Sequence, residues 1–226
     1  MMDAIYTSLF EPIGADGMIG ILLILNGLKV TLIVTFFAMI LGALLGIIIT
    51  YCKTSGKWYL KLPADIYVGI IRGTPVVIQL VILYFVILAS FDIDKVTAAI
   101  IAFGINSGAY ISEIIRSGIQ AVDKGQMEAA RSLGLSHNQS MRHIILPQAI
   151  KNILPALGNE FIMLLKETAV IGFIGGVDLM RAGEIIRSRT FEDMVPLFTC
   201  ALIYLILTYS FTLILGRFEK RLKQSD

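Results

Sequence analysis

Charged residues are scarce in this chain. They make up 16% of its 226 residues, whereas 56% of the residues are hydrophobic. Soluble domains carry about 25% charged residues, so the shortage excludes an ordinary soluble protein and indicates one built for lipid. The mean hydropathy of +0.80 agrees, and the length suits a single domain, residues 1–226. The formal net charge of +2 says little about a membrane protein, in which the placement of charges decides topology. We expect no nucleic-acid partner.

Residues that bind metals are also few. The two cysteines, Cys52 and Cys200, have no metal-ligand spacing and lie near or within apolar runs, so we interpret them as single thiols. The two histidines, His137 and His143, fall in a polar segment and are interpreted as surface residues. We therefore expect no metal site, no cofactor and no catalytic residue in this chain.

A phosphate-binding loop is missing as well. No Gly-x-x-x-x-Gly-Lys-Ser/Thr motif occurs, and the pair Gly56-Lys57 is followed by Trp58, so no backbone cradle for phosphates is predicted. The chain is therefore not expected to be an ATPase. Energy for any transport must come from a bound nucleotide-binding subunit or from an ion gradient.

Long apolar runs are what the sequence does contain. A transmembrane helix needs about 20 mostly apolar residues, and five segments meet this requirement. The shorter run 19–25 is expected to extend the first helix or to lie at the membrane interface. In the first span, Gly42-x-x-x-Gly46 allows close approach of another helix, although such spacings also arise by chance. The sequence therefore predicts an all-α membrane protein with about five transmembrane helices, at residues 27–51, 66–90, 96–115, 150–174 and 194–216.

Basic residues alternate between the two sides of these predicted spans. Lysine and arginine concentrate in the first loop, in the third loop and after the last span, whereas the N-terminal tail and the second loop are mainly acidic. Cytoplasmic loops carry the excess of Lys and Arg. We therefore predict that the N-terminus lies outside the cell, and that the C-terminus and the third loop, residues 121–147, lie in the cytoplasm.

The loop 121–147 has the signals of a folded helical segment. Residues 126–133 favour helix, and Gly134 stands where a left-handed residue would end it. Ser136-x-x-Gln139 is typical of a capping box that opens a second short helix. A helix, a glycine turn and a helix are therefore predicted on the cytoplasmic face. From these residues alone, an ordinary structured loop is the alternative interpretation.

Six ionisable residues fall within or beside the predicted spans: Lys29, Arg72, Glu113, Glu160, Lys166 and Glu167. Each costs about 2.5–3.5 kcal/mol at membrane depth and so suggests a function. Lys29 can extend its charge to the interface, and Glu113 is expected to pair with Arg116 one helical turn on. The roles of Lys166 and Glu167 stay open.

Glu160 differs from the other five. It lies about ten residues into the fourth predicted span, near the middle of the membrane. Its own helix offers no cation three or four residues away in either direction. The carboxylate must therefore face a cavity, another helix or a positively charged substrate, and a pair with Arg72 is the structural alternative. Asn159, the preceding residue, is a weaker candidate for the same site.

The turn Arg72-Gly73-Thr74-Pro75 supplies a complementary half. Thr74 is predicted to be an N-cap with Pro75 in the first helical position, so a helix would begin inside or near the membrane. The free amides of such a helix, next to Arg72, suit a carboxylate. A structural kink, with Arg72 paired to Asp65 or to the lipid surface, is the alternative.

Three stretches of this sequence resemble one known family. Residues 72–80 read Arg-Gly-Thr-Pro-x-x-x-Gln-Leu, residues 108–134 read Gly-Ala-Tyr-x-Ser-Glu and then Gly-Gln-Met-Glu-Ala-Ala-Arg-Ser-Leu-Gly, and residues 146–168 begin Leu-Pro-Gln-Ala and end Lys-Glu-Thr. Together with the spacing of the spans, they resemble the permease subunits of bacterial ABC importers for polar amino acids. One departure is Ala169-Val170, where the subfamily usually has Ser-Leu.

The resemblance implies a set of partners. A coupling helix in a groove of a separate ATPase would be formed by Glu128, Ala129, Ala130, Arg131 and Gly134. Two ATPase subunits would hold the ATP and Mg²⁺, and a second permease copy, identical or a close paralogue, would complete the translocation path. An extracellular solute-binding protein and a multi-pass location in the bacterial inner membrane are also implied.

The function predicted from these features is that of the transmembrane subunit of an ATP-driven amino-acid importer that works by alternating access. With Arg72, Gly73 and Thr74 facing a carboxylate and Glu160 facing a positive charge, the substrate is predicted to be arginine, lysine or histidine. The alternative is an ion-gradient-driven secondary transporter or channel subunit. That alternative predicts inverted repeats, and the five predicted spans show no obvious halves.

Overall fold

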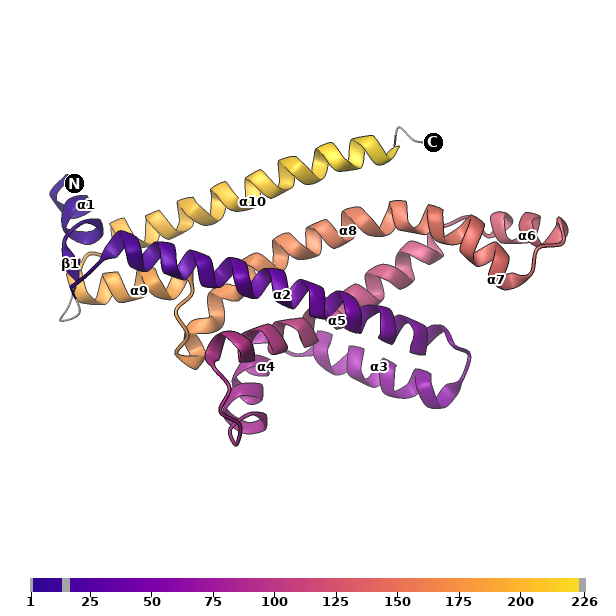
Figure 1. Cartoon of the computed structure of the whole chain (residues 1–226), viewed down its shortest axis with the longest axis horizontal. Helices are drawn as coiled ribbons and strands as arrows, with labels where there is room; N and C mark the ends of the chain where they lie inside the picture. The colour runs from indigo at the N-terminus through magenta and orange to yellow at the C-terminus, as the bar shows by residue number, and fades with distance from the viewer. Residues whose placement is uncertain (1, 14–16, 224–226) are drawn as a thin grey trace.

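Helices make up nearly the whole of this chain. The computed structural model describes residues 2–13 and 17–223, and Figure 1 shows the helices laid out along one long axis. A pair of two-residue antiparallel strands, β1 and β2, is the exception among the described elements. In chain order the elements are α1 (Met2–Leu9), β1 (Pro12–Ile13), β2 (Met18–Ile19), α2 (Gly20–Thr54), α3 (Trp58–Gly73), α4 (Val76–Ile82), the π-helical turn η1 (Leu83–Ile87), α5 (Lys95–Gln120), α6 (Lys124–Ser132), α7 (His137–Ser140), the π-helical turn η2 (Met141–Ile145), α8 (Leu146–Glu167), the 3₁₀ turn η3 (Thr168–Ile174), α9 (Leu179–Thr190) and α10 (Met194–Lys223).

The longest of these helices, α2, has 35 residues. It contains no proline and is almost entirely apolar, so nothing interrupts its ladder of backbone hydrogen bonds. The short apolar run that starts at Ile19 continues into this helix, which confirms the first of the two alternatives predicted for it.

Helix α2 packs more extensively on α5 than on any other described element. A Cβ atom added to Gly42 would lie 2.9 Å from the Ser107 Cβ, and one added to Gly46 would lie 2.7 Å from Cγ2 of Ile111. Both distances are shorter than real side chains accept. The two glycines therefore permit the close approach of α2 and α5 that their spacing suggested.

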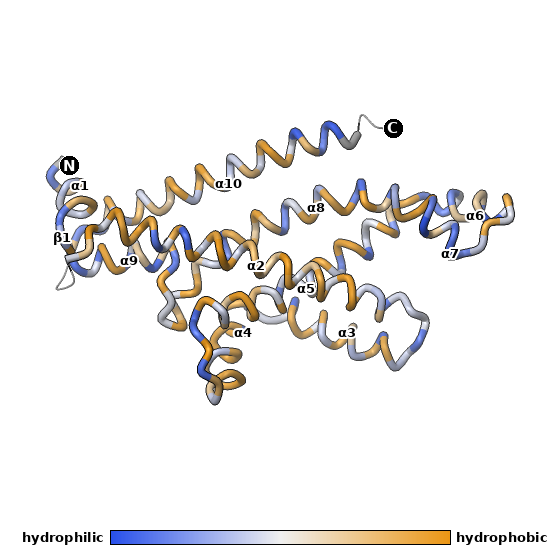
Figure 2. The backbone as a smooth tube through the Cα atoms, in the orientation of Figure 1, coloured by the Kyte–Doolittle hydropathy of each residue, from blue (hydrophilic) through white to orange (hydrophobic). Residues whose placement is uncertain are grey.

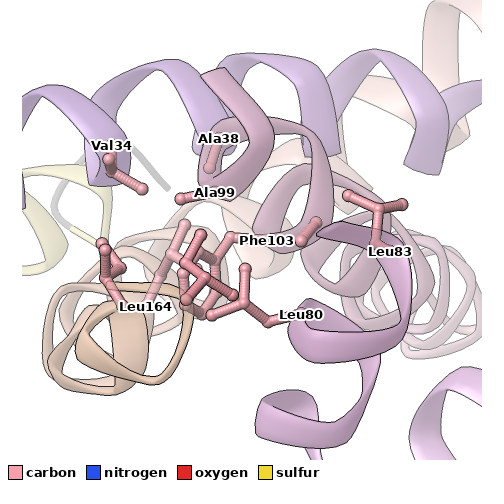
Figure 3. Close-up of a cluster of buried hydrophobic side chains, with 10 residues drawn as sticks. Val34, Ala38, Leu80, Leu83, Ala99, Phe103 and Leu164 are labelled. Atoms are coloured by element: carbon pink, nitrogen blue, oxygen red, sulfur yellow. The ribbon is translucent and has the colours of Figure 1, made fainter. Parts of the chain in front are cut away.

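The main hydrophobic core joins residues of α2, α4, η1, α5, α8 and η3 (Figure 3). Val34 and Ala38 of α2 face Phe103 of α5, and Leu80 of α4 and Leu164 of α8 close the cluster. Phe103, Leu80 and Val34 are fully buried. This cluster therefore ties the helix pair α2 and α5 to the two segments, α4 and α8, on which the site depends.

The second predicted span is broken in two, as the helix start predicted within it at the Arg-Gly-Thr-Pro turn indicated. Instead of one helix over 66–90, α3 ends at Gly73 and a new helix begins at Val76, with an angle of 109° between α3 and the segment Val76–Ile87. The cause lies between them, because Pro75 has no amide hydrogen for a continuing helix. The chain therefore turns sharply there, at the motif Arg-Gly-Thr-Pro.

Three helices of the described chain are long and apolar enough to cross a membrane: α2, α5 and α10. The bent pair of α3 with α4 and η1 is a fourth candidate if it counts as one span. Helix α8 has 22 residues, enough to cross a bilayer. It carries four charged side chains, however, so its composition does not identify it as a membrane span. The total of five spans therefore stays a prediction.

The hydropathy of the chain varies from one part of the molecule to another (Figures 1 and 2). Helices α6 and α7 lie at one end, whereas α1, the strands and α9 lie at the other. The α7 region is among the most hydrophilic parts of the chain, whereas long stretches of α2 and α10 are hydrophobic (Figure 2). Helix α10 leaves its apolar span almost wholly exposed, with 6% of it buried, as expected of a lipid-facing helix. Which end faces the cytoplasm stays a prediction.

Candidate functional site

The polar segment 121–147 folds as predicted, as a helix, a glycine turn and a short helix. Asp123 caps α6 by accepting a hydrogen bond of 2.6 Å from the Gly125 amide. At the other end Gly134 has φ +87°, the left-handed value expected of a C′ residue. The Gly134 amide donates to the Arg131 carbonyl at 3.0 Å and the Leu135 amide to the Ala130 carbonyl at 3.2 Å, which is the Schellman pattern.

The second short helix of this segment begins with the predicted capping box. The hydroxyl of Ser136 accepts from the Gln139 amide, and the Gln139 side chain accepts from the Ser136 amide. Below these caps, Val122 and Met127 pack on Ile145 and Ala149, which anchors the segment to α8. The segment is therefore a folded surface feature, packed against α8 at the end of the bundle.

The residues predicted to couple to an ATPase do not all face outward. Glu128, Ala129 and Arg131 are exposed, but Ala130 is buried, with 4% of its surface accessible. Arg131 also donates to the Leu135 carbonyl at 2.8 Å, so part of its guanidinium serves the turn. Sequence reasoning missed Leu133, whose side chain is 84% exposed at the tip of this segment. The sequence signal that could have pointed to Leu133 is a large apolar residue directly before the C′ glycine, Gly134.

Glu160 lies inside the molecule. Its side chain is 7% exposed, and its Oε1 accepts a hydrogen bond of 2.8 Å from the hydroxyl of Ser107 on α5. No described residue forms an ion pair with it, so the predicted structural alternative, a pair with Arg72, is wrong. Asn159 is exposed on another side of α8. Ser107 was missed by sequence reasoning, because a serine among apolar residues gives no signal of its partner.

Arg72 finds a different acidic partner from those predicted. Its Nη1 lies 3.9 Å from Oε2 of Glu113, and its guanidinium sits 5.2 Å above the centre of the Tyr110 ring. The predicted pair with Asp65 is therefore wrong, since Asp65 lies 3.1 Å from the amine of Lys53. The contact of Arg72 is loose and its side chain is 44% exposed, so it can reach another anion without a large loss.

Glu113 is the centre of a charge cluster. It makes the predicted pair with Arg116, at 2.6 Å, and also a pair of 2.6 Å with Lys53 at the end of α2. Each carboxylate oxygen of Glu113 therefore has a cationic partner, Lys53 on α2 for Oε1 and Arg116 on α5 for Oε2. Arg72 therefore adds a third, weaker contact to an acid that is already neutralised.

Thr74 does not have the predicted role of N-cap. The structure places Pro75 at the cap position, and no side chain caps α4. The hydroxyl of Thr74 instead donates to the Ile70 carbonyl at 2.8 Å and accepts from the Gln79 side chain at 2.8 Å. The single hydroxyl hydrogen of Thr74 is therefore already used in a hydrogen bond within the chain. Gly73 borders open space, since an added Cβ would meet no atom within 4 Å.

One face of α5 brings the two candidate halves of a substrate site together. Ser107 contacts Glu160 of α8, and Tyr110 contacts Arg72 of α3. These α5 residues are three apart, about 4.5 Å along the helix axis. An acid and a base of opposite charge are therefore anchored one turn apart on the same helix, without touching each other. Within residues 2–13 and 17–223 no cluster of three His, Cys, Asp or Glu side chains could hold a metal ion.

Known proteins show the same architecture and related sequences. A family model described as "binding-protein-dependent transport system inner membrane component" matches residues 38–224. The arginine transport system permease protein ArtQ of Bacillus subtilis is 44% identical over 205 residues, which cover 90% of this chain and 94% of that protein. The glutamine transport system permease protein GlnP of Escherichia coli is 37% identical over 204 residues, or 89% and 93% of the two chains.

Solved structures agree with these relatives. A chain from a crystal structure of an amino acid ABC transporter with histidines is 49% identical, with a TM-score of 0.84, and the match covers 88% of this chain and 94% of that one. A chain of the MetNI methionine ABC transporter in inward-facing conformations is 23% identical, with a TM-score of 0.75 over 88% of this chain and 96% of that one, which shows the shared fold alone. Through its family match and these relatives, this chain belongs to the binding-protein-dependent transport system inner membrane components, as the permease subunit of an amino-acid ABC importer.

Proposed function

We propose that this permease imports cationic amino acids, with arginine, lysine and histidine as its substrates. The observation that carries the proposal is Glu160, a carboxylate that is 7% exposed and forms no ion pair with any described residue. Its one hydrogen bond within the described residues, from the hydroxyl of Ser107, comes from a neutral group and occupies one of its two oxygens. A substrate guanidinium, ammonium or imidazolium would supply the missing charge and offset the cost of burying the acid.

Arg72 supports the other half of the proposal. Every amino-acid substrate carries a carboxylate, and Arg72 is a partly exposed guanidinium held by a loose contact of 3.9 Å to Glu113. Guanidinium groups bind carboxylates through two parallel hydrogen bonds. Because Glu113 already has Lys53 and Arg116, moving Arg72 toward a substrate leaves no acid unpaired. In this proposal Gly73 leaves room at the turn, whereas Asn159, which is exposed on another side of α8 from Glu160, is left out of the site.

The transport cycle in this proposal is driven from outside the chain. Two ATPase subunits, which bind ATP and Mg²⁺, dock on α6 through Glu128, Ala129 and Arg131, while Gly134 ends the helix at the groove. A second permease copy, identical or paralogous, lines the path, and an extracellular binding protein delivers the amino acid. An import driven by an ion gradient would leave this folded, exposed α6 without a partner, so it is the less favoured function.

Uptake into proteoliposomes that contain the permease with its ATPase tests the specificity. We expect Glu160→Gln to raise the KM for arginine at least about tenfold, equivalent to roughly 1.4 kcal/mol, while glutamine uptake is unchanged or improves. Glu167→Gln is the matched control, because it removes the same charge from a part-buried residue of the same helix. Arginine uptake that survives Glu160→Gln unchanged, with no gain for neutral amino acids, would show that the assignment is wrong.

A further inference from the structure

The sharp bend between α3 and α4 leaves several backbone carbonyls without their helical donors, among them those of Ile71 and Thr74. In an unbroken helix the amide of residue 75 would donate to the Ile71 carbonyl, and the Ile78 amide would donate to the Thr74 carbonyl. Pro75 has no amide hydrogen, and the Ile78 amide donates to the Pro75 carbonyl instead, at 3.1 Å. At membrane depth an unsatisfied carbonyl costs several kcal/mol. Something else must therefore satisfy both groups.

The side chain of Gln79 does so. Its Nε2 lies 2.7 Å from the Ile71 carbonyl, 3.0 Å from the Thr74 carbonyl and 2.8 Å from the Thr74 hydroxyl, so its two hydrogens are shared among three acceptors. Gln79 is one turn into α4, so its amide group reaches back across the bend to the end of α3. It takes the place of the backbone donors that the break removed from the Ile71 and Thr74 carbonyls.

The opposite end of the same amide group is fastened to α5. The Oε1 of Gln79 accepts a hydrogen bond of 2.9 Å from Nδ2 of Asn106, which is 3% exposed. Asn106 precedes Ser107, the residue that contacts Glu160. One side chain therefore joins α3, α4 and α5 at the level of the proposed substrate site.

We infer that Gln79 is a positioning residue that holds the α3–α4 bend and, through it, places Arg72 beside Tyr110. It does not touch the substrate. The inference about the bend stands on the contacts above, whereas its consequence for transport rests on the proposed function, in which Arg72 binds the substrate carboxylate. Loss of Gln79 should therefore weaken the binding of every amino acid that is carried, whatever its side chain.

The bend can be measured without any substrate. Spin labels at Ile66 on α3 and Val86 in η1, both exposed, report the distance across it in a background in which Cys52 and Cys200 are replaced by serine. We expect Gln79→Glu to shift and broaden this distance distribution, because a carboxylate has the same shape but cannot donate to the α3 carbonyls. An unchanged distribution would overturn the inference.

Two further variants guard against a trivial loss of folding. Asn106→Leu removes the contact to α5 but leaves the donors of Gln79 in place, so a smaller shift of the distance is expected. Asn26→Asp makes the corresponding amide-to-acid change at an exposed position of α2 and should leave the distance unchanged. A shift of the same size in Asn26→Asp as in Gln79→Glu would show that the added charge, rather than the lost donors, moves the helices, and would overturn the inference.

Uptake by the assembled importer then separates the inference from the proposed function. With Gln79→Glu we expect the KM for arginine and for glutamine to rise together, about fivefold or more, with little change in kcat. Glu160→Gln should raise the KM for arginine alone. If Gln79→Glu shifts the spin-label distance but neither KM changes, the bend does not place a carboxylate-binding group, and the role of Arg72 in the proposed function is refuted.

Discussion

Replacing Gly42 with alanine should push α2 away from α5 at their closest crossing. The added Cβ would lie 2.9 Å from the Ser107 Cβ and 3.2 Å from the Gly108 amide nitrogen, whereas ordinary contacts begin at 3.4 Å. The helices must therefore separate by about 0.5 Å, the difference between 3.4 and 2.9 Å. Overpacking of this kind costs about 1–3 kcal/mol, and the better helix propensity of alanine returns about 0.5–1 kcal/mol.

A matched substitution isolates the packing cost. Gly69 lies within α3, and an added Cβ there would meet no atom within 4 Å, so Gly69→Ala keeps the gain in helix propensity without the clash. The two variants should therefore differ in unfolding free energy by about 1–3 kcal/mol. At roughly 2–4 °C per kcal/mol for a chain of this length, thermal unfolding of the purified protein in detergent resolves that difference.

The same substitution should also disturb transport, because Ser107 faces both Gly42 and the Glu160 carboxylate. We expect Gly42→Ala to reduce amino-acid uptake more than Gly69→Ala does. If the two alanine variants unfold at the same temperature and transport equally well, then α2 and α5 do not meet at this crossing, and the reasoning from their contact distances is refuted.

Three further predictions concern the ends of helices. Gly134→Ala places a Cβ on a residue with φ +87°, at a cost of about 1–2 kcal/mol, so amide hydrogen exchange over residues 130–135 should speed up; unaltered exchange would contradict the role of this turn. Leu133→Asp, at a side chain that is 84% exposed, should leave permease stability unchanged but weaken retention of the ATPase in gel filtration, and full retention would place Leu133 outside the contact. The hydroxyl and amide of Thr97 donate to Asp94 and hold the pKa of that carboxyl below its usual 3.8. Because the pKa of Asp94 is lower in the folded state, its ionised carboxylate stabilises the protein. This stabilisation is present above pH 3.8 and is lost as the pH falls through the folded pKa. Wild type should therefore unfold at a higher temperature than Asp94→Ala at neutral pH, and the difference should shrink below about pH 4. A difference that does not change with pH would show that the charge of Asp94 is not its cause.

Local signals predicted local structure well. The capping box at Ser136 and the left-handed turn at Gly134 depend on hydrogen bonds between residues three to five positions apart, so the sequence contains all the groups involved. The pair of Glu113 with Arg116 is of the same kind. The prediction failed at Thr74, because a residue before proline can either begin the next helix or end the previous one, and here the Thr74 hydroxyl is held by the Ile70 carbonyl and the Gln79 side chain.

Partners that are distant in the sequence were not predictable. Two acids, Glu160 and Asp65, were the candidate partners of Arg72, and the acid that it contacts, Glu113, was neither of them. Ser107 meets Glu160 across 53 positions, and Lys53 meets Glu113 across 60. A pattern of apolar residues shows that helices pack, but it does not show their rotation or their register.

The sequence by itself determined that this is a membrane protein, that it contains no phosphate-binding loop motif, and that a polar segment with helix-capping signals interrupts its apolar runs. These properties follow from composition and from short-range hydrogen bonding. The tertiary structure decided which polar groups share a site. Close packing of α2 on α5, permitted by Gly42 and Gly46, presents one face of α5 to both Glu160 and Arg72. That arrangement depends on contacts among helices far apart in the chain, and no local pattern records it.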